Sequence, residues 1–147
     1  MKGRTGEPAD GRNEVQSGRA PEPVGPYPHA RRAGNLLFLS GIGPRVKGVA
    51  GVPGVTLDAQ GDVLSYDFES QCRQVFANVR TVLEDAGSSW ERIVDVTVFL
   101  TDIKRDFATM NRLYAEAFPD PRPARTTVGV SRLPTPIAIE LKVIATT

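Results

Sequence analysis

Two charged side chains near the C-terminus could carry out chemistry together. Arg125 stands in Pro-Ala-Arg-Thr-Thr, at the start of a predicted strand. Its guanidinium offers a planar fork of donors that can bind a carboxylate through two hydrogen bonds, although spacing alone favours a surface arginine in an ion pair. Glu140 lies among β-branched residues in Ile-Ala-Ile-Glu-Leu-Lys-Val-Ile. It is either a water-activating carboxylate in a partly dry site or an exposed one. Taken alone, the segment favours exposure, because Lys142 on the same face has the character of a solvated charge.

Other polar residues could assist a ligand through hydrogen bonds only. Hydroxyl and amide side chains cannot act as acids or bases near neutral pH, and those of interest are Tyr27, Ser40, Asn111, Thr126 and Thr127. A structural role for Asn111 is supported at least as well as a functional one, because it lies beside the apolar stripe of a predicted helix. His29 is the single histidine, and a lone histidine is more often structural or solvated than a general base.

The cysteine and histidine counts exclude two kinds of site. The single cysteine, Cys72, permits no intrachain disulfide, and one Cys with one His cannot build a zinc site rich in these ligands within one chain. Cys72 also falls in the apolar stripe of a predicted helix, which indicates an inert core residue. Gly-Ile-Gly-Pro at 41–44 lacks the remaining glycines of a dinucleotide-binding loop. Catalysis would therefore use carboxylates, arginine, hydroxyls and backbone groups, or His29 alone.

Two amphipathic helices are predicted to support these residues. Asp67 can cap a helix that runs to about Asp85, where Gly87 follows as a terminator. Its apolar residues recur at spacings of three and four: Phe68, Cys72, Val75, Phe76, Val79, Val82 and Leu83. The second helix opens at Thr101 or Asp102, and its stripe consists of Phe107, Met110, Tyr114 and Phe118.

Alternating or apolar runs predict the strands. They are 36–40, a short one around 55–57 inside the Gly/Pro-rich loop 41–65, then 93–100, 126–130 and 138–145. In the run 93–100, Val94, Val96, Val98 and Leu100 should share one side. In 138–145, one face should carry Ile139, Leu141, Val143 and Ala145, and the other face Glu140 and Lys142. Two helices on one face of a mixed sheet make an α+β two-layer domain. The partly apolar opposite face predicts a cover by another subunit.

Composition limits the remaining possibilities. The 147 residues amount to one domain, and 18 Lys and Arg against 17 Asp and Glu give no basic excess for nucleic-acid binding. No apolar run is long enough to cross a bilayer, and no secretory signal is recognisable at the N-terminus, so we expect a cytoplasmic protein without membrane or nucleic-acid partners. Residues 1–20 hold four glycines and no aromatic residue. They are predicted to be a disordered tail, which leaves 21–147 as the folded domain.

A series of segments resembles the RidA (YjgF/YER057c/UK114) family. The resemblance runs in order through about residues 21–146. Its segments are Gly25-Pro26-Tyr27, Gly34 to Gly41 (GNLLFLSG), Gln71 to Val79 (QCRQVFANV), Leu83 to Gly87 (LEDAG), Val96 to Asp102 (VTVFLTD), Asn111 to Tyr114 (NRLY), Arg122 to Val128 (RPARTTV) and Leu133-Pro134. The segments Tyr27 to Arg32, Ser40 to Arg45 and Leu133 to Lys142 are similar to the 2-aminomuconate deaminase branch. Two positions depart from the family pattern, where Ile42 replaces a frequent Gln and Thr127 a frequent Cys.

The resemblance implies a chorismate-mutase-like homotrimer, or a dimer of trimers, with clefts between subunits. It implies hydrolysis of enamines and imines of carboxylic acids to ketones and ammonia, without cofactor or metal. Carried over by position, Arg125 would clamp the substrate carboxylate, while Glu140 and the backbone carbonyl of Thr127 would hold the attacking water. The cleft would be lined by Tyr27, Ser40, Gly41 and Asn111.

The substrate follows from the finer resemblance. 2-Aminomuconate, which is hydrolysed to 4-oxalocrotonate, carries a second carboxylate that needs its own cation. The candidates are Arg45, His29, Arg31, Arg32 and Lys47. A generic 2-aminoacrylate or 2-iminopropanoate deaminase, a tailoring protein for a biosynthetic enamine and a non-catalytic carboxylate-binding regulatory trimer remain as alternatives. The presence of both Arg125 and Glu140 favours an enzyme, because a carboxylate sensor needs the arginine alone.

Overall fold

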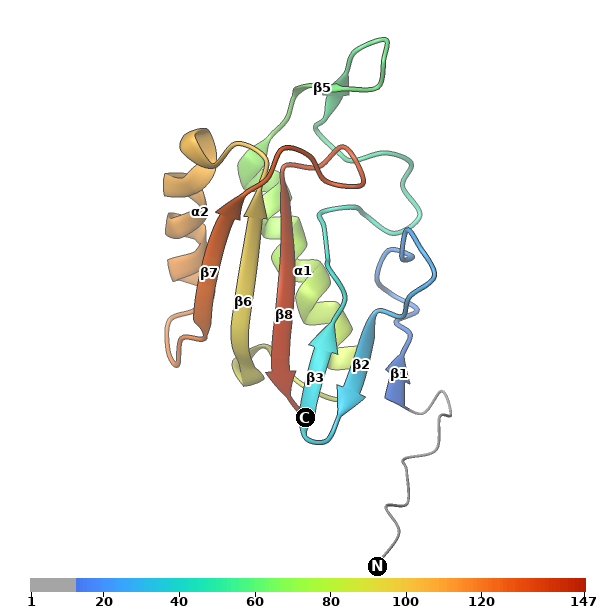
Figure 1. The fold of residues 1–147 in the computed structure, drawn as a ribbon, viewed down its shortest axis with the longest axis vertical. Coiled ribbons are helices and arrows are strands. Elements are labelled where there is room, and N and C mark those ends of the chain that lie inside the picture. Colours follow the sequence, from blue (N-terminus) through green and yellow to red (C-terminus); the bar gives the residue numbers. More distant parts are fainter. Residues whose placement is uncertain (1–12) are drawn as a thin grey trace, which may run out of the picture.

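A computed structural model describes residues 13–147, in which six strands form one mixed sheet (Figure 1). Only β6 and β7 run parallel, and every other neighbouring pair is antiparallel. In spatial order the strands are β1 (Glu14–Val15), β2 (Ala30–Ala33), β3 (Leu36–Leu39), β8 (Ile139–Thr146), β6 (Ile93–Leu100) and β7 (Ala124–Gly129). A separate two-stranded ribbon consists of β4 (Thr56–Leu57) and β5 (Val63–Ser65).

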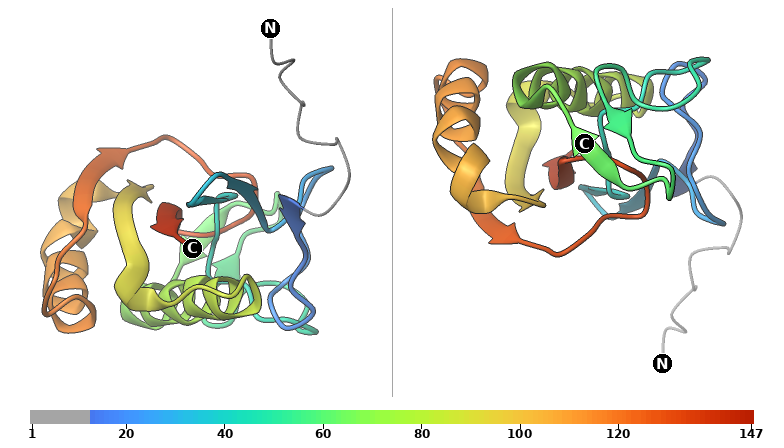
Figure 2. Two further views of the ribbon diagram at one scale, coloured as in Figure 1. Left: turned by 90° about the horizontal axis from the view of Figure 1, so that it is seen from below. Right: turned by 90° about the horizontal axis from the view of Figure 1, so that it is seen from above.

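Both predicted helices are confirmed, and each begins at the expected cap. The α1 helix (Phe68–Asp85) has the carboxylate of Asp67 as acceptor for the Ser70 amide at 3.1 Å. The α2 helix (Ile103–Ala117) has Asp102 in the same role for the Arg105 amide at 3.0 Å. A short 3₁₀ turn, η2 (Trp90–Arg92), precedes β6. Both helices cover the same side of the curved sheet (Figure 2), so the predicted α+β architecture is confirmed.

The core lies between the helices and one face of the sheet, and β8 shows most clearly how the sequence builds it. Ile139, Leu141, Val143 and Ala145 are all buried, whereas the residues between them are only partly covered. This strand pairs with β3 on one side and β6 on the other. Because side chains alternate between faces along a strand, the other face carries Glu140, Lys142 and Ile144. In β3 and β6, Phe38 and Phe99 share that open face by register.

The predicted facing of β6 is wrong at one residue. Ile93 pairs with Ala145 and Asp95 with Ile144, so Val94 is an extra residue in a β-bulge. Val94 is therefore 43% exposed, and Ile93 takes the buried place that was expected for it. A bulge changes the alternation by one residue, and nothing in a run of β-branched residues announces it. Val96, Val98 and Leu100 are buried as predicted.

The predicted disordered tail is too long. Residues 1–12 lie outside the described residues, but 13–20 belong to the fold: β1 pairs with β2, and Val15, Ser17 and Ala20 are buried. Long-range partners on α1 and β2 stabilise this segment, and local composition does not register such partners. β2 itself, which contains Arg31 and Arg32, was not predicted either. None of the helices within residues 13–147 is both long and apolar enough to span a bilayer.

A buried asparagine of α1 holds the loop that follows β3. The Asn78 amide donates to the carbonyls of Gly43 and Arg45 at 2.9 and 2.7 Å, and its oxygen accepts from Gln74 at 2.9 Å. We expect Asn78→Ala to lower the free energy of unfolding by about 1–3 kcal/mol, because both carbonyls lose a partner in a covered site. Urea denaturation measures this. Thr81→Ala is the matched control, since the Thr81 hydroxyl bonds only within its own helix, and equal losses for both variants would contradict the prediction.

Candidate active site

A pocket opens where the sequence-predicted residues around β3 and β8 converge. It is lined by Tyr27, Ser40, Gly41, Arg45 and Glu140, and by the N-terminal segment at Ala20–Val24. The chain continues past β3 through a bridge in which Ile42 and Leu141 exchange two backbone hydrogen bonds of 2.9 Å. This bridge is one residue out of register with the Phe38–Ile144 pair. The extra residue accompanies the irregular stretch at Ser40-Gly41 that forms part of the pocket wall.

Glu140 lies half-buried against Gly41. A Cβ atom on Gly41 would overlap the Glu140 carboxylate, so glycine is needed for this close approach and not for an unusual φ angle. Burial raises the pKa of Glu140 above that of an ordinary glutamate, because a carboxylate loses solvation there. A partly desolvated carboxylate at a pocket wall can accept a proton from water near neutral pH.

Ser40 and Tyr27 have defined partners within the chain. The Ser40 hydroxyl donates to the Pro28 carbonyl at 2.7 Å, and its amide donates to the His29 carbonyl at 3.0 Å. The Tyr27 side chain is 40% exposed, and its hydroxyl accepts from the Val24 amide at 3.3 Å. The Ser40 oxygen can still accept a hydrogen bond from a ligand, and the exposed Tyr27 ring can pack against one.

Arg125 occupies a second location, on the helix-covered side of β7. Its guanidinium donates to the Asn111 side-chain oxygen at 2.7 Å and contacts Met110 of α2. Its central carbon lies 4.7 Å from the centre of the Tyr114 ring, a favourable cation–π distance. Within residues 13–147 no carboxylate forms an ion pair with it. The surface ion pair that spacing favoured is therefore absent from the described part of the chain, and Asn111 serves to orient the guanidinium.

Thr127 lies two residues further along β7. The Thr127 and Tyr114 hydroxyls are buried and have no hydrogen-bond partner among the described residues, and burial raises the pKa of Tyr114 to about 12. Buried polar atoms without partners cost free energy. Tyr114 and Met110 belong to the predicted apolar stripe of the α2 helix. Both are indeed buried, but only the tertiary structure shows that they also contact Arg125.

The predicted site residues thus fall into two groups that do not meet within one chain. Arg125 pairs in register with Val96, whose side chain is in the core, whereas Glu140 pairs with Phe99 on the open face. Arg125, Asn111 and Thr127 are also absent from the lining of the pocket that contains Glu140. The two groups lie on opposite faces of the sheet.

The cations proposed for a second carboxylate are placed very differently. Arg45 lines the pocket and donates to the Glu22 carbonyl at 2.5 Å, while Lys47 forms an ion pair with the Glu22 carboxylate. Arg32 donates to the Ala86 carbonyl at the end of α1, and Arg31 pairs with Phe38 in the sheet. His29 lines the pocket, but backbone groups occupy both of its ring nitrogens. Arg45 is therefore the best placed of the five.

Lys142 does not have the solvated environment that its sequence context suggested. Its ammonium donates to the carbonyl of Leu39, immediately before Ser40, and burial lowers its pKa. The backbone contact helps to hold the end of β3 at the pocket. Within residues 13–147 there is no cluster of three or more His, Cys, Asp or Glu side chains suited to a metal ion.

The family of the chain follows from its similarity to known proteins. Residues 17–147 match the family described as Endoribonuclease L-PSP. A RutC family protein of Pyrococcus horikoshii is 42% identical over 129 residues, which cover 86% of this chain and 90% of that protein. The chloroplastic Reactive Intermediate Deaminase A of Arabidopsis thaliana is 38% identical over 132 residues, covering 90% and 64% respectively. The chain belongs to the RidA (YjgF/YER057c/UK114) family.

Solved structures agree with this assignment. The YjgF gene product of E. coli superposes with a TM-score of 0.76 at 34% identity, covering 90% of this chain and 97% of that one. E. coli TdcF, solved with bound serine, gives a TM-score of 0.77 at 31% identity, covering 91% and 98%. The names within the family describe different activities, a deaminase in one relative and an endoribonuclease in the family description.

The contact between Gly41 and Glu140 gives a direct test of the pocket geometry. We expect Gly41→Ala to move the carboxylate toward solvent, because the added Cβ overlaps the flexible end of the Glu140 side chain. The pKa of Glu140 should then fall toward the ordinary value, with little change in melting temperature, and carboxyl-carbon NMR titration measures it. Gly18→Ala is the control, since a Cβ there meets no atom within 4 Å. An unchanged titration in Gly41→Ala would show that the carboxylate lies elsewhere.

Proposed function

We propose that this protein is a cofactor-independent hydrolytic deaminase of enamine and imine carboxylic acids. The observation that carries the proposal is the Arg125 guanidinium, oriented by Asn111 and free of carboxylate partners among the described residues. A planar guanidinium in this state is suited to a ligand carboxylate. The relative named as a deaminase and the TdcF structure with bound serine, a carboxylate ligand, support the same chemistry.

The reaction uses the two charged residues in different roles. A 2-enamine takes up a proton at C3 and gives one up from nitrogen to become the imine, and water then adds at C2. The resulting carbinolamine transfers its hydroxyl proton to nitrogen and loses ammonia to leave the ketone. Arg125 neutralises the adjacent carboxylate, which makes C2 more electrophilic and holds it in place. Glu140 accepts the proton of the attacking water and returns it to the leaving amine. The Thr127 backbone carbonyl provides a second contact for that water.

Both roles require a second copy of the chain. Arg125 and Glu140 lie on opposite faces of the sheet, so we propose a homotrimer in which a cleft between neighbours unites Arg125 of one copy with Glu140 and Tyr27 of the next. The open face carries Phe38, Phe99 and Ile144, each partly exposed, and neither helix of residues 13–147 covers it (Figure 2). Apolar groups of this kind favour burial against another subunit.

A mixed-chain experiment tests the shared cleft. Arg125→Ala and Glu140→Gln should each be inactive in ammonia release from an enamine generated in solution. Coexpressed, the two chains should recover about a quarter of wild-type activity, because a random cyclic trimer contains intact sites only where the two wild-type residues come from different copies. The double variant Arg125→Ala/Glu140→Gln, which cannot form an intact site in any trimer, serves as the blank. Sedimentation showing a monomer at micromolar concentration, or no recovery in trimers shown to be mixed, would refute the shared site.

The raised pKa of Glu140 predicts the pH dependence. The base must be ionised, so kcat should fall as the pH decreases through this raised value, at a higher pH than for an exposed glutamate, whose pKa is about 4.3. Glu140→Gln should lower kcat by roughly 10²–10⁴-fold and remove this acidic limb. If Glu140→Gln binds a carboxylate but turns over at the wild-type rate, the group is structural. A wild-type protein that binds and never turns over would instead be a carboxylate-binding regulator.

The finer proposal is that the substrate is a dicarboxylate such as 2-aminomuconate, with Arg45 as the cation for the distal carboxylate. Arg45→Ala should raise KM for a dicarboxylic enamine about ten- to a hundredfold, the effect of one charge-assisted hydrogen bond. The KM for 2-aminoacrylate should stay nearly unchanged, so the ratio of kcat/KM values for the two substrates is the quantity to measure. Lys47→Ala, which removes a neighbouring cation paired with Glu22, is the control. A constant ratio in Arg45→Ala would remove the support for a dicarboxylate at this position.

A further inference from the structure

The N-terminal strap, defined here as Ser17–Val24, forms one wall of the Glu140 pocket. Its residues Ala20, Pro21, Pro23 and Val24 line the pocket opposite Ser40, Gly41 and Glu140. Ser17 and Ala20 are buried, although the strap contains no helix or strand of its own. The shape of the pocket therefore depends on what holds an otherwise irregular segment in place.

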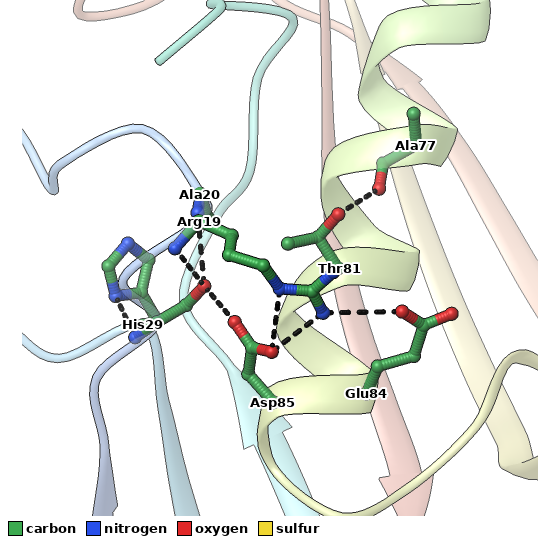
Figure 3. Close-up of polar contacts among 8 residues, drawn as sticks. Arg19, Ala20, His29, Ala77, Thr81, Glu84 and Asp85 are labelled. Carbon is green, nitrogen blue, oxygen red and sulfur yellow. Dashed lines mark hydrogen bonds and ion pairs between the residues drawn. The ribbon is translucent and has the colours of Figure 1, made fainter. Parts of the chain in front are cut away.

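One attachment joins the strap to the end of α1. The Ser17 hydroxyl donates to Asp85 at 2.6 Å, and the Arg19 guanidinium donates to the other oxygen of the same carboxylate at 3.0 and 2.6 Å (Figure 3). The Ala20 amide in turn donates to the Ser17 hydroxyl at 3.0 Å. These hydrogen bonds lower the pKa of Asp85. The Arg19 side chain is 58% exposed, so its ion pair contributes little compared with the buried Ser17 contacts.

The second attachment is the ring of His29, which is 6% exposed. The Ser17 amide donates to Nδ1 at 3.0 Å, and Nε2 lies 2.8 Å from the Pro21 carbonyl. An amide N–H needs an acceptor and a carbonyl needs a donor, so Nδ1 must be bare and Nε2 must carry the proton. The two contacts define a single neutral tautomer. The His29 backbone carbonyl also accepts from the Ser40 amide, which connects this residue directly to the opposite wall of the pocket.

We infer that His29 is a positioning residue that latches the N-terminal strap over the pocket, and that the latch opens when the ring is protonated. A proton on Nδ1 would face the Ser17 N–H, so two donors would meet where a hydrogen bond had been. The strap would keep the Asp85 contacts and lose its fixed position at Ser17 and Pro21. The effect on turnover rests on the proposed deaminase function, whereas the latch itself does not.

The charged groups around the latch come from several elements. Asp85 approaches from α1, Arg19 from the strap, and Arg45, Glu140 and Tyr27 line the same pocket. Asp85 favours a positively charged ring, and its lowered pKa keeps it ionised under mildly acidic conditions. Arg19 opposes that effect by sharing the carboxylate.

Nitrogen NMR of the wild-type ring gives the first test and needs no variant. At pH 8 the Nε2–H tautomer should be the main form, and the Ser17 amide should exchange slowly with solvent. When the pH is lowered until the nitrogen shifts report a doubly protonated ring, the Ser17 amide should exchange roughly tenfold faster relative to its intrinsic rate. An Nδ1–H tautomer at pH 8, or Ser17 protection that does not change when the ring is protonated, would overturn the inference.

Three substitutions separate the two ring contacts. His29→Asn places an oxygen near Nδ1 and should retain Ser17 protection without any dependence on pH. His29→Gln can still donate toward Pro21 but should lose Ser17 protection, and His29→Leu should lose both. Arg73→Met is the matched control, because Arg73 forms its ion pairs with Glu69 and Glu116 on the exposed side of the helices. Equal protection of Ser17 in His29→Leu and in the wild type would refute the latch.

Turnover shows whether the latch positions the pocket. His29→Leu should raise KM about five- to tenfold with kcat within about twofold of the wild type, as expected when a binding wall is lost and the reacting groups are retained. His29→Asn, which keeps the acceptor for the Ser17 amide, should have a KM at pH 8 close to that of the wild type. Faster exchange of the Ser17 amide in His29→Leu together with an unchanged KM would overturn the positioning role. Absence of turnover in the wild type as well would refute the deaminase proposal instead, while the exchange data would still decide the latch.

Discussion

The two-sided alternation of β8 is the constraint on which the core and the site both depend. The strand is hydrogen-bonded on both edges, by β3 and by β6, so it cannot rotate without breaking two ladders. Its buried residues pack under α1, and the same geometry places Glu140 on the opposite face, beside Gly41. A shift of one residue would exchange the faces and bring a carboxylate and an ammonium into the core. The stability of the fold and the position of the proposed base are therefore set by the same register.

The distribution of functional groups over both faces explains why a single copy is insufficient for the proposed reaction. Arg125 is held against α2 by Asn111 and Tyr114, and Glu140 lies against Gly41, just after β3. Each group is positioned well by its own surroundings, yet the sheet separates them. In the proposed trimer, the apolar open face would provide the association energy, and the clefts at its margin would unite the two groups. Association and catalysis would then depend on the same surface.

The helices and their caps were predictable because their signals are local. Asp67 and Asp102 cap the helices within three residues of sequence, and the apolar stripes reflect a period that needs no distant partner. The bulge at Val94, the strand β2 and the ordered segment 13–20 were not predictable in this way. Each depends on a neighbouring strand or on α1, so nothing in its local sequence distinguishes it from an ordinary alternation, a turn or a tail.

By itself, the sequence determined the chemical types available to the site: the guanidinium of Arg125 and a few further cations, one carboxylate among β-branched residues, a few hydroxyls and a single imidazole. It also determined that side chains at 139, 141, 143 and 145 share a face, because the period of a strand is a local property. Only the tertiary structure decided that Arg125 has no acid partner in residues 13–147, that Lys142 bonds a backbone carbonyl, and that both nitrogens of His29 are occupied. The physical reason is that ionic state, tautomer and solvation depend on atoms brought close by folding, many of them far away in the chain.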